Sequence, residues 1–463
     1  MSIRRFKRSV HLPVTAAEAF AWHERPGAFD RLEPPWAPVE VVEKRGGITD
    51  GSRVELSVPF GPARLRWRLE HRDYKAGEQF RDVQLSGPFK SWVHTHRFKE
   101  NGQGSELTDD IEFAVPLGAV GNALAGGRIA RDLDALFVYR HHITRHDLRV
   151  ATRFRDEPRR TVAITGASGL IGSALARWLE FEGHSVYRLV RHPARGAQEI
   201  EWNAETGVLA PDRLASVDTV VHLAGENIAH GRWSERKKRA IHESRVRGTA
   251  MLARSMTAAL TPPSALVSAS AIGWYGDRGD EALDESSSAG TGFLAGVCLD
   301  WEAAAAPARD SGLRVVHPRI GAVVTPRGGM LAKLLTPFKV GLGGPVGSGN
   351  QWVSWVSLDD CVMALYEAIM NNGLEGPMNV TAPNPVSNRD LARSLGRVLH
   401  RPAIAPLPAA AARAAFGEMA DEILLASGKV LPTRLDSAGF EFRDPDLEPY
   451  LARVLGRAES EAA

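Results

Sequence analysis

The fold of this chain is decided by the stretch Thr161-Val-Ala-Ile-Thr-Gly166-Ala-Ser-Gly169-Leu-Ile-Gly172-Ser-Ala-Leu-Ala-Arg-Trp-Leu-Glu180. Its first residues form a short apolar run rich in β-branched side chains, which predicts a buried strand. Three glycines follow with the spacing G-x-x-G-x-x-G, and a helical pattern begins directly after them. The stretch therefore predicts a strand, a tight turn and a helix in that order.

This order of elements predicts a site for the pyrophosphate of a dinucleotide. Gly166 permits the tight turn, Gly169 lacks a side chain that would keep the pyrophosphate from the backbone, and Gly172 lets helix and strand pack closely. The helix N-terminus adds free N–H groups and the positive end of its dipole. The alternative is an ordinary glycine-rich turn. The predicted cofactor-binding residues of the loop are Gly166, Ala167, Ser168, Gly169, Leu170, Ile171 and Gly172.

The end of the next predicted strand, residues 185–190, indicates which dinucleotide is bound. A site that prefers NAD keeps an acidic residue there for the ribose 2′-hydroxyl. This chain has Arg191 and, four residues later, Arg195. A guanidinium binds a 2′-phosphate through paired charge-assisted hydrogen bonds, whereas a carboxylate repels it. We therefore predict NADP(H) as the cofactor, with Arg191 as the main contact and Arg195 as the weaker candidate; the alternative is that both arginines are simply solvated.

Two further strands are expected to end at the same edge of the sheet. One covers residues 218–222 and runs into Leu223, Ala224 and Gly225. The small residues Ala224 and Gly225 let the backbone approach a cofactor. The other begins at Leu266 and leads to Ser270 and Tyr275.

Residues before 150 follow a different pattern. Thr15 and Glu18 form a capping box that opens a short helix. Apolar and charged residues then alternate along 54–60, 63–70, 80–85, 91–98 and 107–113, which predicts antiparallel strands, and a long helical segment closes the region. This order, with the opening T-x-A-E-A-F, resembles the START-like (polyketide cyclase/SRPBCC) helix-grip superfamily. The resemblance implies either a cavity for a small hydrophobic ligand or a filled core.

Histidines are frequent in this first region. His94 and His96 are two residues apart on one strand, and His141, His142 and His146 lie near its end. Such spacings can provide metal ligands, but no acidic or cysteine residue stands at ligand spacing along the chain. We therefore predict that these histidines lie on a solvated face and that the chain has no metal site.

Several stretches of the second half resemble the atypical epimerase-like family of extended short-chain dehydrogenases/reductases, with its C-terminal domain of unknown function. The glycine loop, V-V-H-L-A-G at 220–225, S-A-S-A-I-G-W-Y-G at 268–276 and H-P-R-I-G at 317–321 resemble the extended (sugar epimerase/dehydratase-like) fold as a whole. Four further stretches narrow the resemblance to the atypical family: G-E-N-I-A-H-G-R-W at 225–233, S-R-V-R-G-T at 244–249, G-F-L-A-G-V-C-L-D-W-E at 292–302 and M-N-V-T-A-P-N-P-V-S at 378–387. The resemblance covers residues 160–457. It implies that Ser270 occupies the position of the serine or threonine that binds the substrate carbonyl.

The resemblance also shows what this chain lacks. Working members of the wider superfamily carry a Tyr-x-x-x-Lys pair on the helix after that serine, and the pair moves a proton while hydride transfers. The corresponding helix here starts at Phe293 and contains neither tyrosine nor lysine. Tyr275 is the nearest phenol, so we predict Ser270 and Tyr275 as the catalytic candidates; for Tyr275 the alternative is a packed loop aromatic.

Composition limits the classes of protein to which this chain can belong. Its 463 residues exceed one ordinary domain, and 44% apolar and 24% charged residues are typical of a soluble globular protein. A net charge of +2 gives no reason to expect nucleic acid, and two cysteines exclude a disulfide framework. No apolar run is long enough to span a bilayer, and the basic N-terminus lacks the apolar core of a signal peptide. We expect a cytoplasmic protein with neither nucleic acid nor membrane as partner.

The sequence thus predicts an α/β protein in several parts: a START-like α+β helix-grip domain at 1–150, a linker at 151–159, a Rossmann-like doubly wound parallel sheet at 160–400 and a small helical lobe at 401–457. We expect an NADP(H)-binding oxidoreductase or epimerase that acts on a small carbonyl or sugar-like compound. The alternative is a catalytically inactive protein that responds to NADP(H) and binds a hydrophobic ligand in its first domain.

Overall fold

The computed structural model describes residues 3–60, 63–116, 118–207, 209, 211–229 and 231–458. The chain divides into two compact units, one made of residues before 157 together with those from 452 onward, the other of residues 157–451. None of the helices among the described residues is both long enough and apolar enough to cross a membrane.

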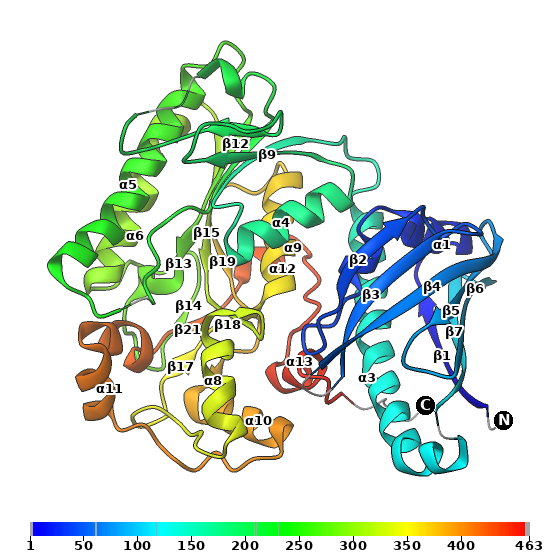
Figure 1. The fold of residues 1–463 in the computed structure, drawn as a ribbon. Helices are drawn as coiled ribbons and strands as arrows, with labels where there is room; N and C mark the ends of the chain where they lie inside the picture. Colours follow the sequence, from blue (N-terminus) through cyan, green and yellow to red (C-terminus); the bar gives the residue numbers. More distant parts are fainter. Residues whose placement is uncertain are drawn as a thin grey trace. The chain divides into compact units, whose positions relative to one another are not determined.

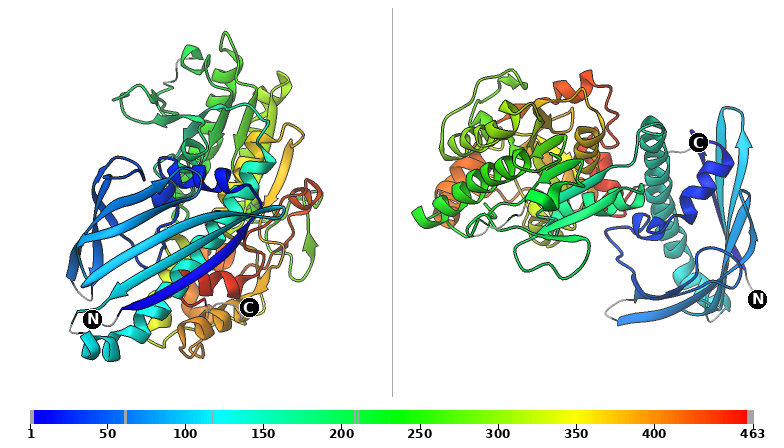
Figure 2. Two further views of the ribbon diagram at one scale, coloured as in Figure 1. Left: turned by 90° about the vertical axis from the view of Figure 1, so that its right-hand side faces the viewer. Right: turned by 90° about the horizontal axis from the view of Figure 1, so that it is seen from above.

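The first unit is an antiparallel sheet with a long helix against one face (Figures 1 and 2). Its elements are β1 (Arg4–Leu12), α1 (Ala16–Glu24), α2 (Ala28–Arg31), β2 (Glu40–Arg45), β3 (Arg53–Phe60), β4 (Ala63–Lys75), β5 (Gln79–Ser86), β6 (Ser91–Asn101), β7 (Gly104–Ala114) and α3 (Gly118–Arg153). The strand order is β1-β7-β6-β5-β4-β3-β2. The predicted capping box is present, since Thr15 accepts the Glu18 N–H and the Glu18 carboxylate accepts the Thr15 N–H. The predicted helix-grip order is confirmed.

The inner face of this sheet packs against α3 through apolar and aromatic side chains. The buried cluster consists of Leu56, Leu69, Trp92, Ile111, Phe113, Val115, Leu133 and Phe137. Beside it lies a group of buried polar residues that sequence reasoning placed in solvent. The side chains of His94, His96, His141 and His146 are all buried, and His142 is half-buried. The prediction of a solvated histidine face is therefore wrong.

Strand pairing explains why His94 and His96 are buried. Asp82 of β5 lies opposite His94, and Asp109 of β7 lies opposite His96. Each imidazole thus has a carboxylate within reach, and buried polar groups persist where such partners satisfy them. The acidic partners come from neighbouring strands, so spacing along the chain could not show them.

The second unit is a parallel sheet whose strand order β10-β9-β8-β11-β12-β15 runs outward in both directions from β8, and β19 continues it beside β15. This is the doubly wound order 3-2-1-4-5-6 of dinucleotide-binding folds. The strands are β8 (Thr161–Thr165), β9 (Ser185–Val190), β10 (Glu199–Glu201), β11 (Thr219–His222), β12 (Ala265–Ser268), β13 (Ser270–Ala271), β15 (Arg314–Ile320) and β19 (Gly376–Val380). The predicted Rossmann-like sheet is confirmed.

Helices cover this sheet, and short pairs of strands form the lobe beside it (Figure 1). The helices are α4 (Leu170–Phe181), α5 (Glu235–Thr257), α6 (Phe293–Ala303), α7 (Ala306–Asp310), α8 (Gly329–Lys339), α9 (Leu358–Met370), α10 (Asn388–Leu399), α11 (Ala409–Phe416), α12 (Thr433–Ser437) and α13 (Leu447–Val454). The short strands are β14 (Ala282–Leu283), β16 (Ala322–Thr325), β17 (Trp352–Val353), β18 (Trp355–Ser357), β20 (Val386–Ser387) and β21 (Lys429–Val430).

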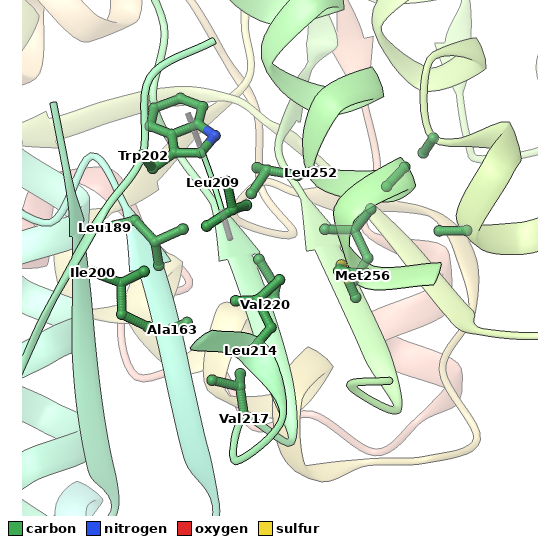
Figure 3. Packing of buried hydrophobic residues seen from close by; sticks show 14 of the residues in the cluster. Ala163, Leu189, Ile200, Trp202, Leu209, Leu214, Val217, Val220, Leu252 and Met256 are labelled. Atoms are coloured by element: carbon green, nitrogen blue, oxygen red, sulfur yellow. The ribbon is translucent and has the colours of Figure 1, made fainter. Parts of the chain in front are cut away.

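Packing between α5 and the sheet fixes the first half of this unit. Figure 3 shows Leu189 and Val220 of the strands gathered with Leu252 and Met256 of the helix, and all four side chains are buried. Burying a side chain of this size contributes about 1.5–3 kcal/mol. This core holds the carboxyl ends of β8, β9 and β11 side by side, where the predicted cofactor residues lie.

Candidate functional site

The glycine loop lies between β8 and α4 and has the conformation that its three glycines predict. Gly166 has a φ of +67°, and a Cβ there would lie 2.9 Å from the carbonyl carbon of Leu223. A Cβ on Gly172 would lie 2.2 Å from the carbonyl oxygen of Gly166. Such contacts are too short for any side chain, so the turn and the close packing both require glycine. Ser168 and Gly169 are exposed at the N-terminus of α4, where phosphates would bind.

The loop after β11 lies against the glycine loop at the point where the strand order reverses. Ligands of open parallel sheets bind at this switch point, outside the carboxyl ends of the strands. The Thr165 hydroxyl accepts the N–H groups of Leu223 and Ala224 at 3.1 Å each. The structure therefore brings two of the predicted cofactor segments together.

Thr165 and His222 hold this arrangement, and sequence reasoning overlooked both. They are partners in the parallel register of β8 and β11. The Thr165 Oγ1 lies 2.7 Å from Nδ1 of His222, and because this hydroxyl already accepts two N–H groups, it donates its own hydrogen to the imidazole. Burial, together with the charge of Arg245, lowers the pKa of His222 to about 3, so the ring is neutral. The available signal was that each residue ends an apolar strand beside a glycine-containing loop.

Arg245 of α5 holds the second half of the β11 loop. Its Nη1 donates to the carbonyl oxygens of Glu226 and Ile241, at 3.1 Å each. Its guanidinium also lies 5.0 Å from the ring centre of Trp301. A Cβ on Gly225 would lie 3.1 Å from this guanidinium, so the glycine leaves room for the arginine beside the loop.

Arg191 follows the last residue of β9, the strand that pairs with β8. Its side chain is exposed, as is that of Arg195. Arg191 therefore lies next to the carboxyl end of the strand where an NAD-preferring site would carry a carboxylate.

The two catalytic candidates, Ser270 and Tyr275, belong to one buried polar network. Ser270 donates to Glu302 of α6 at 2.7 Å, and Arg319 of β15 donates to both Glu302 oxygens at 2.8 and 2.9 Å. Arg319 also donates to the Tyr275 hydroxyl at 3.0 Å, and that hydroxyl donates to Asn379 at 2.8 Å. Sequence reasoning missed Glu302, Arg319 and Asn379, because they come from three separate elements.

The network is enclosed by protein. Tyr275 has no exposed surface, and Ser270 is 3% exposed. Burial raises the pKa of Tyr275, so the phenol stays protonated at neutral pH. The Arg319 guanidinium lies 3.8 Å from the ring centre of Trp274. Both candidate hydroxyls are thus used within the protein, as the packed-aromatic alternative for Tyr275 anticipates.

Helix α6, which follows Ser270 and Tyr275 in the chain, carries a neutral thiol. Burial, with a further effect from Glu302, raises the pKa of Cys298 to about 11. At the N-terminus of the helix, the N–H groups of Phe293 and Leu294 donate to the carboxylate of Glu422, at 3.0 Å each. Glu422 comes from the C-terminal lobe, for which sequence reasoning found no chemical role.

Comparisons with known proteins match all three parts of the chain. Residues 162–380 match the NAD dependent epimerase/dehydratase family, residues 407–454 match a domain of unknown function (DUF1731), and residues 4–138 match the polyketide cyclase / dehydrase and lipid transport family. The epimerase family protein Mb2239 of Mycobacterium bovis is 47% identical over 281 residues, which cover 61% of this chain and 93% of that protein.

Solved structures agree with these matches. The nucleoside-diphosphate sugar epimerase of Corynebacterium glutamicum is 35% identical, with a TM-score of 0.77, over 98% of this chain and 91% of that one. The human epimerase family protein SDR39U1, crystallised with NADPH, is 34% identical, with a TM-score of 0.58, over 64% of this chain and 99% of that one. This chain therefore belongs to the epimerase family of short-chain dehydrogenase/reductase-like proteins, with an N-terminal START-like domain and the C-terminal DUF1731 domain.

Proposed function

We propose that this chain binds NADP(H) at the glycine loop and transfers hydride to or from a small carbonyl or sugar-like compound. The observation that carries the proposal is the loop itself. Gly166 has a positive φ, a Cβ on Gly172 would meet the loop backbone, and Ser168 and Gly169 are exposed just before the first residue of α4. The human relative, which shares this part of the chain, was crystallised with NADPH. The Corynebacterium relative supports a nucleoside-diphosphate sugar as one class of substrate to test.

In this proposal Arg191 binds the 2′-phosphate, and residues 166–172 with Leu223, Ala224 and Gly225 bind the rest of the dinucleotide. When bound, the nicotinamide supplies the hydride chemistry. Ser270 lies beyond the end of β12 and hydrogen-bonds the substrate oxygen after leaving Glu302. Tyr275 holds Arg319 in place, and Arg319 in turn holds Glu302, so the phenol acts as a positioning residue.

A second candidate function is a protein that binds NADP(H) without turnover and whose START-like domain responds to the state of the cofactor, with a hydrophobic ligand in that domain. It is favoured by the closed network, because Ser270 and Tyr275 both use their hydroxyls inside the protein. The absence of tyrosine and lysine from α6 agrees with it.

An assay of NADPH oxidation separates the two candidates. The full chain is incubated with NADPH and a panel of aldehydes, ketones and nucleoside-diphosphate 4-keto sugars, and absorbance of the reduced nicotinamide is followed. The first candidate predicts turnover of at least one compound, with kcat reduced in Ser270→Ala. Stoichiometric NADPH binding with no turnover across the panel contradicts the first candidate and supports the second.

Tyr275→Phe tests the positioning role in the same assay. Removal of the hydroxyl takes away one of the acceptors of Arg319 and leaves Asn379 with an unsatisfied oxygen, so we expect kcat to fall while the KM for NADPH stays unchanged. Tyr366→Phe is a matched control, because that buried phenol lies within hydrogen-bond distance of His184 in the same unit. An equal loss of kcat in both variants would indicate general destabilisation and contradict the positioning role.

A further inference from the structure

Two buried histidines of the first unit, His94 and His96, lie close to one carboxylate oxygen of Asp82. Oδ2 of Asp82 lies 3.6 Å from Nδ1 of His94 and 3.3 Å from Nε2 of His96. The three residues offer ligand atoms that all lie within 4.8 Å of one another. They come from the adjacent strands β5 and β6, whose hydrogen-bonded pairing fixes their positions.

The two separations are longer than a strong charge-assisted hydrogen bond, although Nε2 of His96 is still within hydrogen-bond distance of Asp82, and both match the spacing of ligands around an ion. An imidazolium and a carboxylate in direct contact approach to about 2.7–2.9 Å. A tetrahedral ion with bonds of about 2.1 Å holds its ligand atoms about 3.4 Å apart. The distances of 3.3 and 3.6 Å are close to the second value.

The other nitrogen of each imidazole is directed to a second carboxylate. Nε2 of His94 and Nδ1 of His96 lie 2.8 and 2.7 Å from Oδ1 of Asp109. Histidines that bind a metal almost always donate their other N–H to such a group, which fixes the tautomer and orients the ring. Asp109 is itself held, because Nε2 of His141 lies 2.6 Å from its Oδ2. Each imidazole of the pair thus has one nitrogen near Asp82 and the other near Asp109, and of the two contacts with Asp109 the one from His94 has hydrogen-bond geometry.

Asp82 is supported in the same way and also provides access. Its Oδ1 lies 2.7 Å from Nδ1 of His71. The Asp82 and His71 side chains keep 17% and 12% of their surface exposed, whereas Asp109 keeps 3%. An ion can therefore reach the group from the Asp82 side, while the supporting carboxylate stays out of water.

We propose that Asp82, His94 and His96 bind a divalent transition-metal ion such as Zn²⁺, with Asp109 and His71 as the supporting groups. Two imidazoles and one carboxylate form a ligand set that suits Zn²⁺, Co²⁺ and Fe²⁺, and three protein ligands leave a position for water. The competing arrangement has a proton in place of the ion. Burial acts to lower the pKa of His96, but the carboxylates of Asp109 and Asp82 raise it to about 9. Without a metal ion, a His96 imidazolium would then lie between these two carboxylates.

The test is metal binding by the untagged full chain after removal of metal with a chelator. Zn²⁺ is titrated in competition with a chromophoric chelator, and Co²⁺ is followed by its visible absorption. We expect one ion per chain and the intense visible bands of tetrahedral Co²⁺. Asp82→Asn and His94→Gln should weaken binding at least 100-fold, and Asp109→Asn should weaken it by about 10–100-fold. His11→Gln, which removes an exposed histidine of β1, is the control and should bind as the wild type does.

Two outcomes overturn the proposal: a folded wild-type chain that binds neither Zn²⁺ nor Co²⁺ stoichiometrically, and binding that persists in Asp82→Asn and His94→Gln. NADPH affinity and circular dichroism show whether each variant is folded. If the variants do not fold, the X-ray absorption spectrum of the Zn²⁺-loaded wild type tests the proposed ligand set without them. Two imidazole nitrogens and oxygen ligands support the site, and a sulfur ligand or a single imidazole contradicts it.

Discussion

At the scale of single residues, Gly172 is the most constrained position of the cofactor loop. A methyl group there would meet the Gly166 carbonyl oxygen at 2.2 Å, which is backbone and cannot rotate away. We expect Gly172→Ala to weaken NADPH binding at least 10-fold and to lower the free energy of unfolding by about 1–3 kcal/mol. Isothermal titration and urea unfolding measure the two effects.

Gly296→Ala is the matched control for this substitution. Gly296 is exposed within α6, and an added Cβ meets no atom within 4 Å. Alanine is the better helix former, so the free energy of unfolding of this variant should rise by about 0.5–1 kcal/mol. Its affinity for NADPH should equal that of the wild type. Unchanged NADPH affinity in Gly172→Ala would show that the loop does not hold the cofactor.

His222 gives the second unit a defined sensitivity to acid. The pKa of a histidine is about 6.5 in the unfolded chain, whereas burial lowers the pKa of His222 to about 3 in the folded chain. Between these values the unfolded chain binds a proton that the folded chain does not. The free energy of unfolding therefore falls as the pH decreases from about 6.5 toward 3, by up to about 1.4 kcal/mol per pH unit from this group.

The measurement is urea unfolding at several pH values in this window. In His222→Gln the amide oxygen can still accept the Thr165 hydroxyl, but no group titrates, so stability should depend less steeply on pH. An identical pH dependence in wild type and variant would mean that His222 is not held neutral.

At the scale of elements, α6 begins at a cap that comes from another part of the chain. The Glu422 carboxylate accepts the first two N–H groups of the helix and places a negative charge at the positive end of its dipole. Glu422→Gln keeps an acceptor but removes the charge, and Glu422→Ala removes both. We expect the free energy of unfolding to fall by about 0.5 kcal/mol in Glu422→Gln and by about 1–2 kcal/mol in Glu422→Ala.

The control for this cap is Asp421→Asn, which removes a surface ion pair with Arg413 of α11. Exposed pairs of this kind contribute about 0–1 kcal/mol. If Glu422→Ala lowers the free energy of unfolding no more than Asp421→Asn does, the Glu422 carboxylate does not cap the helix in solution.

Elements also show where sequence reasoning succeeds and where it fails. The glycine loop could be predicted because its turn, its helix N-terminus and its close packing are all encoded within twelve consecutive residues. The Asp82–His94–His96 group could not, because its members face one another only through the register of β5 and β6. The network around Arg319 was missed for the same reason, since Ser270, Glu302 and Asn379 meet only after the parallel sheet has formed.

At the scale of the whole molecule, the two proposed ligands should act on different units. Hydrogen exchange of the full chain measures this directly, because a ligand stabilises the segments that it binds against opening. NADPH should slow exchange in residues 161–172 and 219–225, and Zn²⁺ should slow it in β5 and β6. NADPH protection that extends to β5 and β6 would contradict an independent action of the two sites and is the result expected of the second candidate function.

Arg191 is the residue through which we propose that this chain holds the phosphorylated dinucleotide. The most direct test is a titration of wild type and Arg191→Ala with NADPH and NADH, followed by nicotinamide fluorescence. A charge-assisted pair of hydrogen bonds to the 2′-phosphate contributes about 1.5–3 kcal/mol, so NADPH should bind wild type at least 10-fold more tightly than NADH. In Arg191→Ala the NADPH affinity should fall toward that of NADH, and the NADH affinity should not change. Equal affinities for both dinucleotides in wild type, or a preference for NADPH that persists in Arg191→Ala, would contradict the claim.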